Sequence, residues 1–361
     1  SIVLVSLGCE LGADMADASL LEQLSKMARA TTHGCLLCDN SGSGEAFKGL
    51  GFDFADFTDY HFYCDLHYFR PLMDHFRRDW LEPRPWIFGE FCANEDYRDP
   101  ADLVDADGNR PWWRDVLGVG STVKRWAYRE QEARMAANNL PFNDRDLERI
   151  ARRQSLVVRK FFIEETRTRR DAGGYVVTGL RDTPITTSGV FDDFNRSKCD
   201  PADFRAYNSD TVLLLEQGRA RVWIDGDRPA PVDRFNHRAG STISLRLVLA
   251  HAGPNIPAAD LEWRLMSPDG TPYATEAVTL AGPLEAGPPH QVARLEIELP
   301  TDAPTGEWTL RASLDDISAN AWPLWVYPAD QPWPADTAIY DSAGSLGGID
   351  DLPRVSAPEH C

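Results

Sequence analysis

The sequence predicts an α/β region followed by an all-β region. Up to about residue 210, short apolar runs typical of buried strands alternate with segments of helical periodicity, the pattern of βα units on a parallel sheet. From about residue 211 the helical signals stop, and apolar and polar residues alternate along short segments punctuated by Pro and Gly. We therefore expect part of a (β/α)8 barrel, with too few strands to close it, followed by a β-sandwich.

Five strands are expected in the first region. They cover residues 1–7, 33–38, 58–64, 86–91 and 175–180. The helices expected between them cover residues 16–30, about 71–80, roughly 122–138 and roughly 144–170. The first helix has Leu20, Leu21 and Leu24 on one face, and Gly173-Gly174 is expected to end the last helix.

The second region, residues 216–328, is expected to be the β-sandwich. Ile243, Leu245 and Leu247 fall on one face of its clearest alternating segment, as a half-buried strand requires. Residues 329–361 are rich in Pro, Ala and Asp and are expected to be a linker or the start of a further domain. The chain opens without Met inside an apolar run, so we expect a fragment that lacks its N-terminal part.

Charge and hydropathy narrow the possible partners. The formal net charge is −19, which argues against nucleic acid or an anionic membrane as a partner. No apolar run approaches the roughly 20 residues that cross a bilayer. Neither observation fixes the compartment or the oligomeric state.

The seven cysteines are expected to be mainly buried free thiols. Cys35 and Cys38 have the spacing of a metal or redox pair, but no second pair or nearby His cluster completes a site. We therefore predict no metal and no cofactor.

Two acidic residues directly follow apolar strands. Glu90 ends the run Pro-Trp-Ile-Phe-Gly-Glu, and Glu10 follows the apolar run near the N-terminus. Burying an unpaired carboxylate is costly, so such an acid is usually paired, exposed at a strand end, or functional. Two carboxyl groups at the same edge of a sheet are the minimal machinery for cleaving a glycosidic bond. The alternative is that each caps a helix or pairs with a surface Arg.

The segments that carry these acids resemble glycoside hydrolase family two, the group of β-galactosidases, β-glucuronidases and β-mannosidases. Residues 1–10 resemble its acid/base strand, which ends Ser-Leu-Gly-Asn-Glu, and residues 85–91 look like its nucleophile strand. The resemblance implies that Glu10 is the general acid/base, at the end of barrel strand 4, and that Glu90 is the nucleophile, at the end of strand 7. Residues 1–212 would then be the C-terminal part of the barrel, strands 4–8, and residues 216–328 an immunoglobulin-like domain.

One position departs from the family pattern. Cys9 stands where the family has an Asn that donates a hydrogen bond to the sugar 2-hydroxyl. A thiol is a weak donor. Either another residue reads the 2-position of the sugar, or the site is altered or impaired.

Other residues are candidates for the site because they lie near the expected strand ends. His61 and Tyr63, two residues apart, point to the same side of their strand, and the resemblance implies that Tyr63 orients the nucleophile. Packing of both under a loop is the alternative. Candidate ligands of sugar hydroxyls are Asp39, Asn40, Asp65, His67 and Asp182. Asp182 either binds a hydroxyl or pairs with Arg181. Of Trp112 and Trp113, at most one is expected to stack on a sugar ring, the other being a core anchor.

The expected function is a retaining glycoside hydrolase acting on a carbohydrate substrate. A second hypothesis is a non-catalytic carbohydrate-binding or scaffold protein with a degenerate site. The presence of Cys9 in place of the usual Asn suggests it. A third is a metal-dependent hydrolase, whose ligands would be Asp59, His61, Asp65 and His67.

Overall fold

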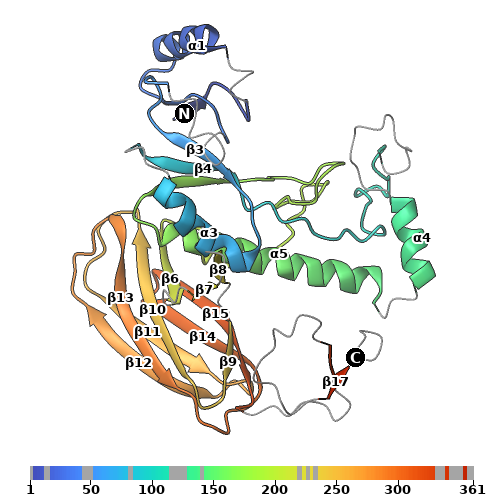
Figure 1. Cartoon of the computed structure of the whole chain (residues 1–361), viewed down its shortest axis with the longest axis vertical. Helices are drawn as coiled ribbons and strands as arrows, with labels where there is room; N and C mark the ends of the chain where they lie inside the picture. The colour runs from blue at the N-terminus through green and yellow to red at the C-terminus, as the bar shows by residue number, and fades with distance from the viewer. Residues whose placement is uncertain are drawn as a thin grey trace.

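The computed structural model of the chain describes residues 3–11, 17–42, 52–79, 84–113, 128–138, 142–217, 222–224, 228–230, 235–329, 338–340 and 353–355. Small sheets and helices of the N-terminal half lie at one end, and two larger sheets lie at the other (Figure 1). The long helix α5 (Asp144–Arg167) runs between these two parts. None of the described helices is long and apolar enough to cross a membrane.

Five short strands of the first half form two separate parallel sheets. β1 (Leu4–Ser6) pairs with β2 (Leu36–Cys38), and helix α1 (Ala18–Thr31) connects them. The second sheet has the order β3-β4-β5. Its strands are β3 (Thr58–Phe62), β4 (Trp86–Phe91) and β5 (Ala172–Val177).

The expectation of a partial (β/α)8 barrel is wrong. The structure is mostly small β-sheets with few helices, 38% strand against 21% helix, and no (β/α)8 pattern is evident in the part of the chain that it describes. No ladder joins β2 to β3 among the described residues, so the five strands do not form one continuous sheet. Local alternation of strands and helices specifies that βα units form, but it does not specify which strands then pair.

Two helix boundaries also differ from expectation. α3 (Leu66–Asp79) begins before Pro71, because the Asp65 carbonyl accepts hydrogen bonds from the amides of Tyr68 and Phe69, both at 3.0 Å. Gly173 and Gly174 lie inside β5 instead of ending the preceding helix. That helix, α5, ends at Arg167. The expected helix at residues 122–138 is described only as α4 (Tyr128–Asn138), and its first residues lie outside the described part.

Aromatic rings form the core beneath the three-stranded sheet. Phe69 of α3 stacks on Phe162 of α5, with ring centroids 4.4 Å apart, and lies 6.3 Å from the ring of Phe88 in β4. Phe88 in turn stacks on Phe62 of β3 at 5.4 Å. All four rings are buried. Such rings contribute both a large apolar area and specific edge and face contacts, so they fix the two helices against the sheet.

Two larger sheets pack face to face in the second half. One has the order β13-β10-β6 and the other β12-β11-β14-β15-β9, and all pairings are antiparallel except β15 with β9. The strands of the first sheet are β6 (Thr211–Gln217), β10 (Thr242–His251) and β13 (Gly287–Glu298). Those of the second are β9 (Asn236–Arg238), β11 (Ala259–Met266), β12 (Pro272–Leu280), β14 (Gly306–Leu314) and β15 (Ser318–Tyr327).

Alternating apolar residues from both sheets fill one common core. Leu245 and Leu295 come from the first sheet, and Leu261, Trp308 and Leu324 from the second. This is the period of two that the sequence shows, with every second side chain turned inward. The remaining short elements are α6 (Pro201–Arg205) and the two-stranded pairs β7 (Val222–Ile224) with β8 (Arg228–Ala230) and β16 (Ile339–Tyr340) with β17 (Arg354–Val355).

A buried polar contact joins α5 to the second sheet. The Glu164 carboxylate accepts hydrogen bonds from Asn320 Nδ2 at 2.7 Å and from Trp322 Nε1 at 2.8 Å, both on β15. Lys160, one turn earlier on α5, pairs with the same carboxylate. Because a buried carboxylate left without partners costs several kcal/mol, these bonds fix how the helix sits on the sheet.

A second buried ionic group joins the irregular segment after β4 to the loops that follow β5. Lys198 Nζ is 2.8 Å from Asp96 Oδ2 and 3.0 Å from Asp182 Oδ1. Burial raises the pKa of the Asp96 carboxyl to about 6, and the positive charge of Lys198 opposes this by lowering the pKa. A raised pKa means that the folded chain holds the proton more tightly than the unfolded chain does. The contribution of this group to stability is therefore complete below about pH 4 and is lost as the pH rises through about 6.

We predict that Asp96→Asn removes this loss of stability at higher pH. The free energy of unfolding of the variant, relative to that of the native protein, should rise by on the order of 3 kcal/mol between pH 4 and pH 7, the equivalent of about two pKa units. Urea unfolding at a series of pH values measures it. Asp107→Asn, at an exposed position of the same segment, is the control and should show no such trend. A difference between Asp96→Asn and the native protein that does not vary with pH would contradict the prediction.

Candidate active site

Glu10 is held at the end of β1 by an unusual backbone conformation. Its φ is +52°, in the left-handed region that residues other than glycine seldom adopt. Its amide donates to the Ser41 carbonyl at 2.8 Å, and the Ser41 amide donates to the Gly8 carbonyl at 3.0 Å. The buried Asn40 side chain accepts from the Leu11 amide at 3.1 Å and donates to the Leu11 carbonyl at 3.0 Å. The segment after β2 thus fixes a turn that would otherwise be strained, and aims Glu10.

Glu90 is aimed by a bulge in β4. Tyr60 pairs with Phe88 and His61 pairs with Glu90, so Gly89 is an extra residue in the ladder. The Gly89 amide donates to Asp59 Oδ1 at 2.7 Å. Bulges of this kind redirect the next side chain, and here the result is that Glu90 and His61 are register partners on neighbouring strands.

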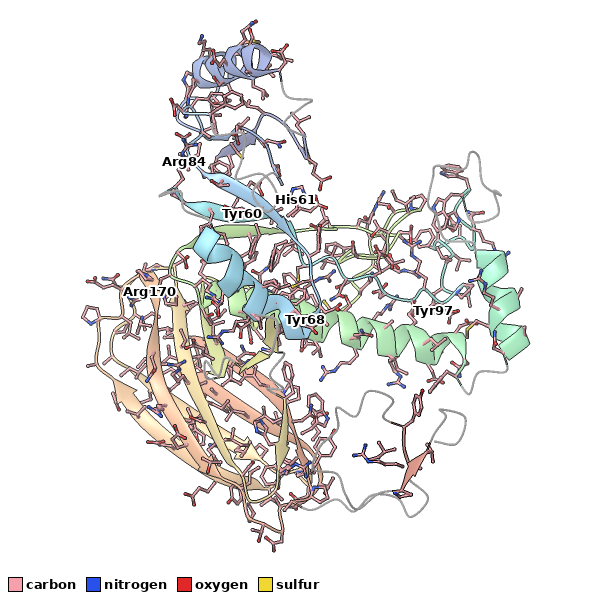
Figure 2. All side chains as sticks on the ribbon, in the orientation of Figure 1. Tyr60, His61, Tyr68, Arg84, Tyr97 and Arg170 are labelled. Carbon is pink, nitrogen blue, oxygen red and sulfur yellow. The ribbon has the colours of Figure 1, made fainter. Side chains whose placement is uncertain are left out.

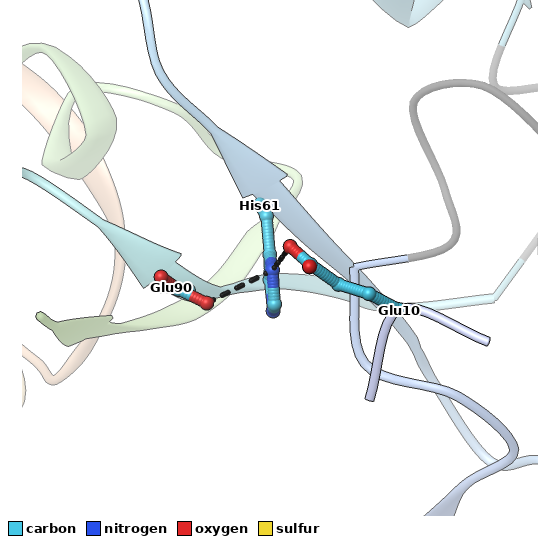
Figure 3. A group of neighbouring side chains, drawn as sticks. All are labelled: Glu10, His61 and Glu90. Atoms are coloured by element: carbon cyan, nitrogen blue, oxygen red, sulfur yellow. Dashed lines mark hydrogen bonds and ion pairs between the residues drawn. The ribbon is translucent and has the colours of Figure 1, made fainter. Parts of the chain in front are cut away.

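The imidazole of His61 lies between the two glutamates. Its Nδ1 is 2.8 Å from Glu10 Oε1 and 3.0 Å from Glu90 Oε2 (Figure 3). His61 is buried, with 6% of its side chain exposed, whereas Glu10 is 65% and Glu90 36% exposed. One oxygen of each glutamate and one ring nitrogen all lie within 4.8 Å of one another. The two acids are thus brought together at the protein surface with a buried base between them. Figure 2 labels His61, which lies on β3.

Tyr63 completes the contacts of Glu90. Its hydroxyl donates to Glu90 Oε1 at 2.6 Å and lies 3.2 Å from Thr178 Oγ1. Burial, followed by the hydrogen bond to Glu90, raises the pKa of the phenol well above its ordinary value of 10.0. The phenol therefore stays a donor, and it holds one oxygen of Glu90 in place.

Ser41 and Asp59 lie behind His61. Ser41 Oγ is 2.9 Å from His61 Nε2 and donates to Asp59 Oδ2 at 2.9 Å. Burial has the largest influence on the Asp59 carboxyl and raises its pKa, whereas the hydrogen bonds from Ser41 and Gly89 act to lower it. Nothing in the sequence distinguishes Ser41 and Thr178 as site residues, because a hydroxyl residue just beyond a strand has no distinctive pattern.

The remaining predicted site residues near β2 and β3 have other positions. Asp39 is buried and accepts a hydrogen bond from the Asn40 amide at 2.8 Å, and Asn40 holds the Leu11 backbone. Asp65 is exposed at the start of α3, where its carbonyl accepts from the helix amides. The side chain of His67 lies outside the described residues. The metal set of Asp59, His61, Asp65 and His67 is therefore not assembled by the described side chains, because the His61 nitrogens face Ser41 and the glutamates.

Cys9 lies beside the acids. Its side chain is exposed, and partial desolvation, followed by the charges of Glu10, Glu90 and Asp59, raises the pKa of its thiol. The thiol is thus kept in its neutral form, as a weak hydrogen-bond donor. Cys38, Cys92 and Cys199 also carry free thiols.

The predicted residues of the later loops form contacts of their own. Asp182 is buried, pairs with Lys198 and accepts from the Gly189 amide at 2.8 Å, so its partner is not Arg181, which is exposed. Trp113 is buried, with the Arg98 guanidinium 5.3 Å from its ring centroid, whereas Trp112 is 79% exposed. Of the two, Trp112 alone presents a face to solvent.

A single ion could also be shared by the three central side chains. Two carboxylate oxygens and one imidazole nitrogen within 4.8 Å match the ligand types of a divalent cation. The distances from His61 Nδ1 to the two glutamates are those of ordinary hydrogen bonds, so a proton within the group accounts for the contacts without an ion.

Comparisons with known proteins give limited information. Residues 241–328 match a family model described as a domain of unknown function, DUF8488, which covers part of the β-rich half alone. No curated protein matches the chain.

Similar solved structures resemble parts of the chain. Trypsin-activated alpha-2-macroglobulin from Escherichia coli is 18% identical with a TM-score of 0.23, and the match covers 32% of this chain and 7% of that one. A CARDB domain from Pyrococcus furiosus, in complex with di-metal ions, is 9% identical with a TM-score of 0.22, over 33% of this chain and 88% of that one. A Parabacteroides merdae β-glucuronidase is 16% identical with a TM-score of 0.19, over 24% of this chain and 12% of that one. Similarities this low carry no argument about fold or function.

We predict that Gly89→Ala disrupts the site. A Cβ atom at Gly89 would lie 2.0 Å from Asp59 Oδ2, so either the bulge or the carboxylate must move. The expected cost is on the order of 2 kcal/mol in the free energy of unfolding, measured by chemical denaturation. Gly174→Ala, on the neighbouring strand β5, is the matched control, because its Cβ would meet nothing closer than 3.9 Å. Equal stability of the two variants would contradict the assigned packing.

Proposed function

We propose that this protein is a retaining glycoside hydrolase that cleaves β-glycosidic bonds through a covalent glycosyl-enzyme intermediate. The observation that supports this most is that an oxygen of Glu10 lies within 4.8 Å of an oxygen of Glu90. Retaining enzymes hold their two carboxyl groups about 5–5.5 Å apart, whereas inverting enzymes leave about 6.5–9.5 Å for a water molecule. The short separation favours direct attack on the sugar by one carboxylate.

Glu90 is the nucleophile in this proposal. Its Oε1 accepts a hydrogen bond from the Tyr63 hydroxyl at 2.6 Å, and this bond fixes the orientation of the carboxylate. Glu90 attacks the anomeric carbon, and the bond between that carbon and the leaving oxygen breaks as the ester bond to the enzyme forms. The residue is partly exposed, so a sugar can reach it.

Glu10 is the general acid/base. In the first step its proton passes to the leaving oxygen, and in the second step it removes a proton from the water that hydrolyses the glycosyl-enzyme. His61 Nδ1, at 2.8 Å, is the hydrogen-bond partner that orients this carboxyl group. The greater exposure of Glu10 leaves it accessible to both the leaving group and water.

A non-catalytic carbohydrate-binding protein with a degenerate site is the alternative. Cys9 is the observation that favours it, because an exposed thiol next to Glu10 is a poorer donor to a sugar hydroxyl than an amide. Under this alternative the acids persist as ligands of sugar hydroxyls.

We predict distinct kinetic effects for the two glutamates. Glu90→Gln should abolish hydrolysis of a panel of 2,4-dinitrophenyl β-glycosides, because no attacking carboxylate remains. Glu10→Ala should retain the first step on these activated substrates, slow the second by about 10²–10⁴-fold, and regain turnover with azide, releasing the β-glycosyl azide. Absorbance of the released phenol and NMR of the sugar product measure these effects.

The control is Glu22→Gln, which removes an exposed carboxylate on α1 and should leave the rates unchanged. If azide restored turnover to a Glu90 variant and not to Glu10→Ala, the roles of the two glutamates would be reversed. Unchanged rates in Glu90→Gln would overturn the proposal.

The Cys9→Asn variant separates the two readings. If the native site is active, the substitution should change the rate by no more than about 10-fold, since one hydrogen bond contributes about 0.5–1.5 kcal/mol. Hydrolysis of the same panel, compared between the native protein and the variant, measures this. Activity that appears only in Cys9→Asn would favour the degenerate site.

A further inference from the structure

Ser41 has a single hydroxyl hydrogen and two neighbours that compete for it. Its Oγ is 2.9 Å from Asp59 Oδ2 and 2.9 Å from His61 Nε2. Asp59 accepts at both of its oxygens, from the Gly89 amide at Oδ1 and from Ser41 at Oδ2, so the hydroxyl hydrogen goes to Asp59. Ser41 Oγ must then accept from His61, which requires a hydrogen on Nε2.

The other ring nitrogen then determines where the next proton lies. With Nε2 protonated, a neutral His61 presents a bare Nδ1 to Glu10 Oε1 at 2.8 Å and Glu90 Oε2 at 3.0 Å. A bare nitrogen and two ionised carboxylates would be three acceptors with no donor among them. One proton must therefore lie in this group, on Glu10 or on Nδ1, within one short hydrogen bond.

We infer that Asp59, acting through Ser41, fixes the tautomer of His61 and thereby keeps a proton on the pair formed by Glu10 and His61 Nδ1. Asp59 and Ser41 are positioning residues, since both act through the imidazole. Asp59 also accepts from the Gly89 amide at 2.7 Å, so one carboxylate both shapes the bulge that aims Glu90 and sets the proton beside Glu10. The role of that proton as the catalytic one rests on the proposed function, whereas the tautomer does not.

Among the described residues, the charged groups that interact with the imidazole are consistent with this assignment. Glu10 approaches from the segment after β1, Glu90 from β4, and Asp59 from the His61 strand itself. Cys9 and Tyr63 lie beside the glutamates. No cationic side chain of the described residues pairs with Glu10 or Glu90 other than His61. Gly42 packs directly against the ring, since a Cβ there would lie 2.5 Å from Nδ1.

Asp59→Asn should reverse the chain of hydrogen bonds. The Gly89 amide is a donor, so the oxygen of the new side-chain amide must take the Oδ1 position and its NH2 group must face Ser41. Ser41 Oγ would then accept from that NH2 group and donate to Nε2. His61 would carry its hydrogen on Nδ1 and donate it to two ionised glutamates, and Glu10 would lose its proton.

The test is ¹⁵N NMR of the imidazole nitrogens in protein labelled at its eight histidines. The His61 signals are identified by their absence in His61→Gln. In the native protein near neutral pH, His61 Nε2 should have the chemical shift of a protonated nitrogen. In Asp59→Asn it should have that of a bare nitrogen, with the hydrogen on Nδ1. Asp65→Asn, which removes an exposed carboxylate four residues after His61, is the matched control and should leave the His61 shifts unchanged.

A second variant covers the case in which Asp59→Asn does not fold. Ser41→Ala removes the acceptor of the Nε2 hydrogen, and the native preference for that tautomer should be lost. A bare Nε2 in the native protein, or the same tautomer in the native protein and in the folded variants, would overturn the inference.

Kinetics separate this inference from the proposed function. If the protein is a glycosidase, Asp59→Asn should lower kcat/KM by about 10²-fold or more for poor leaving groups, which need the acid, and much less for 2,4-dinitrophenyl glycosides. Equal losses for both leaving groups would overturn the placement of the proton. A tautomer change in a protein without glycosidase activity would sustain the hydrogen-bond chain and reject the enzyme.

Discussion

The contact of one imidazole nitrogen with two carboxylates is the constraint on which the rest of the site depends. Two ionised carboxylates with oxygens 4.8 Å apart, the largest separation that this group allows, would repel each other by about 3.5 kcal/mol at an effective dielectric constant of about 20. Solvent around the exposed Glu10 lowers that figure. A proton held at His61 Nδ1 or on Glu10 relieves this repulsion and forms a short hydrogen bond within the group. Glu10, His61 and Glu90 therefore form a group whose total proton count matters more than the state of any one member.

The same group joins parts of the fold that no ladder joins. β1 and β2 form one small sheet and β3, β4 and β5 another, with no strand pairing between the two sheets in the described residues. One backbone hydrogen bond, from the Asp56 amide to the Leu37 carbonyl at 2.8 Å, links β2 to the residues before β3. Side chains make the other connections at the site, through Ser41 with His61 and Asp59, and through Glu10 with His61. The left-handed conformation of Glu10 and the bulge at Gly89 both occur at this junction. Local strain next to convergent acids is typical of a site at which geometry is maintained at some cost to stability.

The sequence was informative where a signal is local. An acid after an apolar strand identified Glu10 and Glu90 as candidates, and alternation along residues 241–250 matches the strand β10. Long-range strand pairing has no such local signal, which is why the predicted barrel is wrong and why Gly173-Gly174, predicted to end a helix, lies in β5. The roles of Ser41, Thr178 and Asp59 depend on hydrogen bonds between segments far apart in the chain. Asp182 looked like a strand-end ligand because its partner, Lys198, lies in another loop.

Covalent trapping tests the account most directly. The protein is incubated with a panel of 2,4-dinitrophenyl 2-deoxy-2-fluoro-β-glycosides, which form a slowly hydrolysed ester with the nucleophile of a retaining enzyme, and the adduct is located by mass spectrometry of peptides. The account predicts one sugar per chain, attached to Glu90. A sugar attached to a different residue, or turnover of the unfluorinated glycoside without any adduct from its fluorinated counterpart, would contradict it.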